Sequence, residues 1–112
     1  MDLQHFFNNV VVRLGIYGWK LNLKKGSSEG FCWKHSKIID IGLDNSHPEE
    51  LILHEIAHIN SCRFCNQKHN FSFWKLFEDL MRRFLPGVEI SQAMRFHQSY
   101  TSKGVYGKVY EH

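Results

Sequence analysis

The sequence has no long apolar run, no block of like charges and no even set of cysteines. None of its apolar stretches approaches the roughly 20 residues of a membrane-spanning helix. Residues 1–5 lack the basic start and the following apolar run of a secretory signal. The net charge of +3 comes without a Lys/Arg run, so it gives no argument for nucleic-acid binding. We therefore expect a cytoplasmic monomer that contacts neither a membrane nor, directly, a nucleic acid.

The three cysteines are Cys32, Cys62 and Cys65. An odd number argues against a secreted disulfide framework and for a reducing compartment. Cys62, Cys65 and His69, together with Cys32, have a spacing that a structural zinc site can use. A redox C-x-x-C is disfavoured because no βαβ pattern surrounds it. Buried thiols are the simplest fate of all three residues, and the structural zinc site stays an alternative.

What the chain does contain is enough apolar and aromatic material for a folded core. Of its 112 residues, 43% are hydrophobic and 14% aromatic, which fits one small globular domain. Apolar periodicity predicts an N-terminal helix, three short strands, a central helix and a following packing helix, at residues 3–14, 19–23, 31–34, 37–43, 49–61 and 71–85. We expect a compact α+β domain over residues 1–112, with a small antiparallel sheet and a tail at 88–112.

The central predicted helix contains His54-Glu55-Ile56-Ala57-His58, which fits the pattern H-E-x-x-H. On a helix, His54 and His58 are one turn apart and project from the same face. Such a pair can bind one zinc ion, with Glu55 beside the open coordination position as a general base. Helical projection puts most aliphatic residues on the other side, so we expect the histidine face to border a cleft. A solvated surface helix gives the same pattern, and the motif alone does not exclude it.

A catalytic zinc site needs a third protein ligand, and the sequence offers two. His69 lies 11 positions after His58 at the start of the next helix, and Glu78 lies 20 positions after His58 within that helix. Extending the helical projection places His69 on the inward side, whereas Glu78 falls at the polar edge beside Arg82. The projection favours His69, and Glu78 stays the alternative.

These motifs together resemble the SprT, WLM and YgjP-like group of zinc metallopeptidases. In that group a helix with H-E-x-x-H is followed by H-x-x-x-F-W or a close variant. The similarity covers about residues 30–86, through Gly30-Phe31-Cys32, the strand at 38–43, Glu50 to His58, and His69-Asn70-Phe71-Ser72-Phe73-Trp74. The resemblance implies zinc bound by His54, His58 and His69, with Glu55 as general base, in a zincin-like domain. The stretch between His58 and His69 is longer than in the shortest members.

A second resemblance is to the minigluzincins, single-domain peptidases whose third ligand is a glutamate, the role that Glu78 would then take. Some of these are held latent by a C-terminal segment that lies over the cleft. In the tail, Ser91 to His97 is predicted as a short helix and Tyr100 to Glu111 as an extended segment or hairpin. The tail could therefore be a surface strand, or a flap that brings His97 near the zinc.

The sequence thus predicts a zinc-dependent endopeptidase that hydrolyses peptide or protein substrates. Two alternatives stay open: a non-catalytic zinc-binding module that recognises a partner, and a latent peptidase blocked by its own tail.

Overall fold

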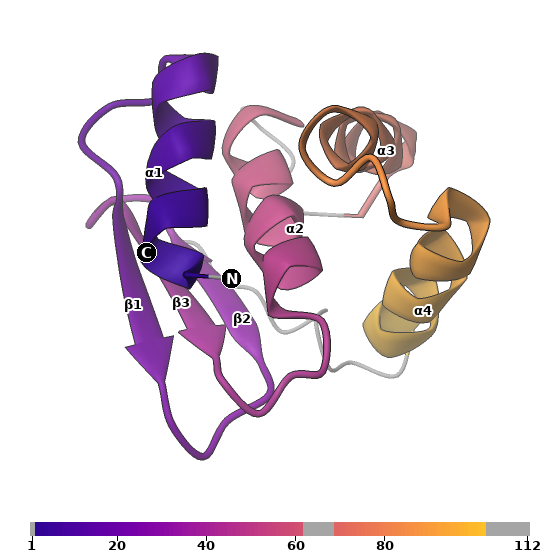
Figure 1. The fold of residues 1–112 in the computed structure, drawn as a ribbon, viewed down its shortest axis with the longest axis horizontal. Coiled ribbons are helices and arrows are strands. Elements are labelled where there is room, and N and C mark those ends of the chain that lie inside the picture. Colours follow the sequence, from indigo (N-terminus) through magenta and orange to yellow (C-terminus); the bar gives the residue numbers. More distant parts are fainter. Residues whose placement is uncertain (1, 62–68, 103–112) are drawn as a thin grey trace.

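The computed structural model describes residues 2–61 and 69–102 (Figure 1). Along these ranges the chain forms α1 (Leu3–Leu14), β1 (Lys20–Lys24), β2 (Gly30–Trp33), β3 (Ile38–Gly42), α2 (Pro48–Ser61), α3 (Phe71–Phe84) and α4 (Ile90–Ser102). The predicted α+β layout is confirmed. The helices and strands predicted between residues 3 and 85 are all present, and each of their ends lies within one residue of the predicted position.

The sheet is mixed rather than wholly antiparallel, and in this detail the prediction was wrong. The strand order is β1-β3-β2. β2 and β3 form an antiparallel pair, whereas β1 runs parallel to β3, with Leu21 opposite Ile39. The prediction of an antiparallel sheet fails at β1, which pairs with β3 and not with β2, the next strand in sequence. Because β3 carries three of the sheet's isoleucines and is mostly buried, it takes the central position between the other two strands.

Helix α2 occupies the middle of the molecule, between the sheet on one side and α3 on the other (Figure 1). Every residue from Glu50 to His58 is buried. The histidine face therefore differs from the predicted border of a cleft, because α3 packs on it. The physical reason is that the apolar face of α3 needs a partner, and Phe73 and Phe77 find one on the histidine face of α2.

The C-terminal part continues the core. The helix predicted at 91–97 is confirmed but is longer, so residues 100–102 are helical and not extended; the rest of the predicted hairpin lies outside the described residues. Helix α4 packs against α3, and its Ala93 and His97 are buried. This part of the tail is thus an integral layer of the fold. Within the described ranges, no helix has both the length and the apolar character of a membrane span.

Candidate metal centre

Three imidazoles converge between α2 and the start of α3. The Nε2 atoms of His54 and His58 each lie 3.1 Å from Nε2 of His69. In the described part of the chain these three residues form the group whose ligand atoms lie close enough together to hold one metal ion. His54 and His58 come from successive turns of α2, as their spacing predicts, and His69 approaches from the connection to α3.

The two separations from His69 are close to those that a bound ion requires, and all three ligand atoms lie within 4.8 Å of one another. Three nitrogens at about 2.0–2.1 Å from a tetrahedral zinc lie about 3.3 Å from one another. Without a cation, protons must occupy some of these closely spaced lone pairs, since two bare lone pairs at this distance repel each other. A divalent cation accepts a lone pair from all three rings at once.

His69 is positioned by the first turn of α3. Asn70 caps this helix, and its side-chain oxygen accepts a hydrogen bond from the backbone N–H of Phe73 at 2.9 Å. The indole Nε1–H of Trp74 donates to the backbone carbonyl of His69 at 3.1 Å. These two bonds fix the chain direction just before the helix and so aim the imidazole of His69 at α2. They give a physical reason for the spacing H-x-x-x-F-W.

Aromatic rings from α3 surround the cluster. The ring of Phe73 stacks on His58 with centroids 4.4 Å apart and an interplanar angle of 27°. His54 meets the rings of Phe73 and Phe77 edge to face, at 4.9 Å and 5.4 Å. His54 and His58 have no exposed surface, and His69 is partly exposed. The rings of α3 therefore shield this side of the site from solvent. The lower local dielectric strengthens any charge interaction inside it.

Two further buried residues extend the cluster on the side of α4. Nδ1 of His97 lies 3.2 Å from Nδ1 of His54, and the two rings are stacked with centroids 5.2 Å apart. The other nitrogen of His97, Nε2, lies 3.1 Å from Oε1 of Glu50. His97 thus contacts the outer nitrogen of His54, on the opposite side of that ring from the three converging Nε2 atoms.

The surroundings favour neutral imidazoles. Burial lowers the pKa of His54 and His58 well below the usual 6.5. Neighbouring histidines lower the pKa of His54 further, and His69 and Lys34 do so for His58. Burial also lowers the pKa of His69 to about 4. For His97, burial lowers the pKa, and the hydrogen bond and charge of Glu50 oppose that shift. Neutral imidazoles are the form that binds a metal ion.

The carboxylate of Glu55 is buried, and neither of its oxygens has a hydrogen-bond partner within the described residues. Burial raises its pKa well above the usual value, and the charge of Asp40 adds to the rise. Strand β2 passes directly over it at Gly30, where a Cβ atom would lie 2.9 Å from Oε2 of Glu55. Only glycine fits there without displacing the carboxylate. An unpartnered buried carboxylate is costly, which suggests that a ligand completes the site.

Glu78, the alternative third ligand, is not part of the cluster. It forms a salt bridge with Arg82 one turn later on α3, with 2.6 Å between Nη2 of Arg82 and Oε2 of Glu78. The structural zinc site suggested for the cysteines falls largely outside the described residues, because Cys62 and Cys65 do so. Cys32 is buried in β2. His69, which that site would share, points instead at His54 and His58.

Sequence reasoning found the three converging histidines and Glu55 but missed Glu50. A usable signal was present, since Glu50 precedes His54 by one helical turn on the same face and is therefore carried into the interior with it. For His97 the sequence left open a place in a flap near the metal centre, and the structure puts it against Nδ1 of His54, away from the converging Nε2 atoms. Comparisons of this chain with protein-family models, with curated proteins and with solved structures found no match.

Proposed function

We propose that this protein is a zinc-dependent peptidase, with zinc bound by His54, His58 and His69. The observation that supports this most is the position of Nε2 of His69, 3.1 Å from Nε2 of both His54 and His58, close to the nitrogen spacing around a tetrahedral ion. Three imidazoles are a common ligand set for catalytic zinc, which keeps its fourth position for water or substrate. The identity of the ion as zinc rests on this nitrogen ligand set and on the resemblance in H-E-x-x-H and H-x-x-x-F-W.

Glu55 is the residue we propose as general base. When bound, zinc acidifies a water molecule and polarises the carbonyl of a peptide bond. Glu55 would accept the proton of the attacking water and deliver it to the leaving amine. The unpartnered oxygens are consistent with this role, since the reacting water would supply the missing hydrogen bond.

The test compares Glu55→Gln with the wild type on fluorescein-labelled casein, with added Zn²⁺ and with a chelator. We expect metal-dependent cleavage by the wild type. In Glu55→Gln, cleavage should fall by about 10²–10⁴-fold, the usual contribution of a general base, while bound zinc stays at the wild-type level. Full activity of Glu55→Gln would contradict the assigned base. Loss of zinc from this variant would show that Glu55 acts on the metal and not on the proton.

A second candidate is a non-catalytic zinc-binding module, and one observation favours it. His54, Glu55 and His58 have no exposed surface, as in many structural metal sites. The same assay separates the candidates, because such a module would bind zinc and leave casein intact. It would also lose thermal stability when zinc is removed. Cleavage by wild type, lost in Glu55→Gln, would exclude it.

A further inference from the structure

The histidine cluster is linked to α4 by a buried row of polar groups. Oε1 of Glu50 lies 3.1 Å from Nε2 of His97, and Nδ1 of His97 lies 3.2 Å from Nδ1 of His54. His54 then presents its Nε2 to His69. We call this row the Glu50–His97–His54 chain. The side chain of His97 has no exposed surface, and that of Glu50 is only 11% exposed.

The directions of the hydrogen bonds in this chain follow from its outer end. An ionised carboxylate only accepts hydrogen bonds, so His97 must donate from Nε2. A neutral imidazole has one N–H, which leaves Nδ1 of His97 as an acceptor. His54 must therefore donate from Nδ1, and its own Nε2 then carries a lone pair. That nitrogen is the one that faces the cluster.

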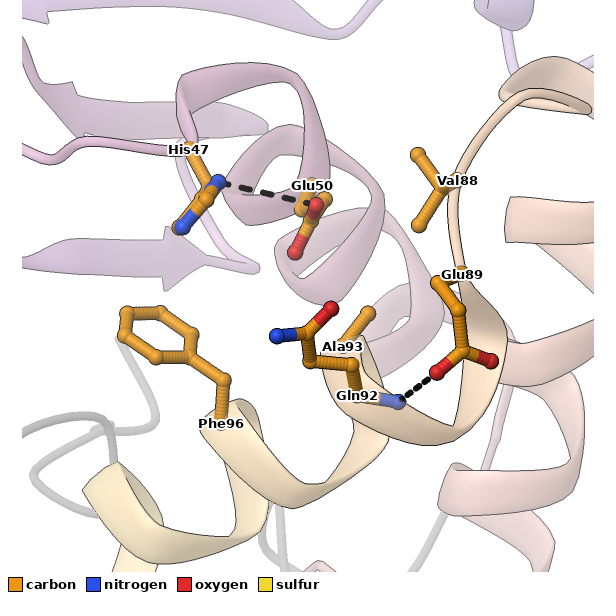
Figure 2. Close-up of a pocket in the computed structure, with 7 residues that line it drawn as sticks. All are labelled: His47, Glu50, Val88, Glu89, Gln92, Ala93 and Phe96. Atoms are coloured by element: carbon orange, nitrogen blue, oxygen red, sulfur yellow. Dashed lines mark hydrogen bonds and ion pairs between the residues drawn. The ribbon is translucent and has the colours of Figure 1, made fainter.

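Glu50 lies at the edge of the core, at the outer end of this chain. It lines a hollow of about 300 Å³ between the start of α2 and α4, shown in Figure 2. Its other oxygen, Oε2, lies 3.7 Å from Nδ1 of His47, which is itself exposed. The outer end of the chain thus borders this hollow, whereas His97 and His54 are enclosed.

We propose that Glu50 and His97 are positioning residues that fix His54 in its metal-binding tautomer. This inference rests on the proposed zinc site and assigns α4 a part in it. His97 touches neither the ion nor a substrate; it acts through His54. A carboxylate that orients a metal-binding histidine through a hydrogen bond is a frequent arrangement, and here an imidazole is inserted between the two. Phe77 of α3 packs on the rings of both His54 and His97 and holds them together.

Two substitutions at position 97 separate positioning from simple packing. In His97→Asn, the amide oxygen takes the place of Nδ1 and still accepts from His54. In His97→Gln, the amide nitrogen takes the place of Nε2 and still donates to Glu50, but His54 loses its acceptor. Both variants lose the imidazole ring. A role in packing alone predicts similar losses in the two, whereas positioning predicts a clear difference.

The first measurement is Zn²⁺ affinity of the full chain by competition with a chromophoric chelator. We expect about 10–100-fold weaker binding in His97→Gln, the usual loss for a residue that orients a ligand, and a loss of less than about tenfold in His97→Asn. Ala93→Gly destabilises α4 but leaves Glu50, His97 and His54 in place, so this variant should bind Zn²⁺ like the wild type. Equal losses in His97→Gln and His97→Asn, or a comparable loss in Ala93→Gly, would overturn the proposal.

The second measurement needs no metal. In the zinc-free wild type, ¹⁵N chemical shifts of the histidine rings should show a proton on Nδ1 of His54, and His97→Asn should keep it there. In His97→Gln we expect a mixture of two neutral forms of His54, one with the proton on Nδ1 and one with it on Nε2. Glu50→Gln gives a further test that preserves the size of the side chain. An amide can donate as well as accept, so it no longer fixes the direction of the hydrogen bond with His97, and we expect the same mixture of His54 tautomers. An unchanged His54 in both Gln variants would refute the positioning role. A wild type that binds no zinc would instead overturn the zinc site, while these shifts still decide the tautomer.

Discussion

The α4 side and the α3 side of the histidine cluster hold their imidazoles by different means. On the α4 side, Nδ1 of His54 is hydrogen-bonded to His97, which is in turn bonded to Glu50. On the α3 side, the ring of His58 stacks on Phe73, and its Nδ1 has no hydrogen-bond partner among the described residues. The two rings belong to one helix and one motif, yet their surroundings are unlike.

The difference shows what each kind of contact can fix. A hydrogen bond through Nδ1 sets both the rotation of an imidazole and its tautomer. A stacking contact sets the plane of the ring but leaves the proton on either nitrogen. We therefore infer that His54 is prepared for the metal before the metal arrives. His58 lacks such a partner on Nδ1, so its tautomer depends on the contact of its Nε2 with His69 inside the cluster.

The largest effect on Zn²⁺ affinity should come from removing the imidazole of either His54 or His58, and the two losses should be similar. His54→Ala and His58→Ala each leave two imidazoles, so Zn²⁺ affinity should fall by more than the ~100-fold maximum usual for an orienting residue. His35→Ala, at an exposed position, is the control and should bind like the wild type. Chelator competition measures all three. Wild-type affinity in either variant at position 54 or 58 would remove that ring from the site.

A substitution at Phe73 breaks the stacking on the α3 side. Phe73 is fully buried, so Phe73→Ala should lower the free energy of unfolding by about 3–5 kcal/mol. Phe71, two residues earlier on the same helix, is 82% exposed, and Phe71→Ala should change stability by no more than about 0.5 kcal/mol. Urea denaturation of the metal-free proteins measures both. Equal changes would mean that α3 does not pack on α2 as described.

A milder test concerns the hydrogen bond that fixes His69. Trp74→Phe removes the donor to the carbonyl of His69, at a cost of about 1 kcal/mol in stability, and should weaken zinc binding. Trp33→Phe removes an indole donor to Asp40 on the sheet and serves as a matched control. It should lower stability by a comparable or larger amount but leave zinc affinity unchanged. A loss of affinity in both variants would point to general loosening.

A further expected effect is a pH dependence of the metal-free protein. The pKa of His69 is about 4 in the folded chain and about 6.5 in an unfolded one. As the pH falls below about 6.5 the unfolded chain takes up the proton first, so stability is full above that pH and declines toward pH 4. Urea midpoints at pH 7 and pH 5 should therefore differ less in His69→Gln than in the wild type or in His35→Gln. Identical differences would contradict the lowered pKa.

Much of the fold was predictable because its signals are local. The apolar spacing of α1 and α3 and the short spacing between His54 and His58 depend on residues a few positions apart. Sheet order is not local: that β3 lies between β1 and β2 depends on which strand the core buries most deeply. The prediction of an antiparallel sheet was therefore wrong for β1. The cover on the histidine face was missed for a similar reason. Helical projection ranks the faces of one helix and is silent on which partner will pack there.

The candidate site divides in the same way. His54, Glu55 and His58 come from one motif, and the placement of His69 followed from projecting α3 backwards. The Glu50–His97–His54 chain joins residues 43 and 47 positions apart, across two packed helices. A lone glutamate and a lone histidine have no spacing pattern that predicts such a contact. Only the packing of α4 on the core brings them together.

The metal content of the purified protein tests the zinc site most directly. Elemental analysis would compare the wild type with His69→Ala and Glu78→Ala, all expressed with zinc and dialysed alike. We expect one zinc ion per chain in the wild type and in Glu78→Ala, and none in His69→Ala. A wild type without metal, or a Glu78→Ala variant that loses zinc while His69→Ala retains it, would contradict a centre built from three histidines.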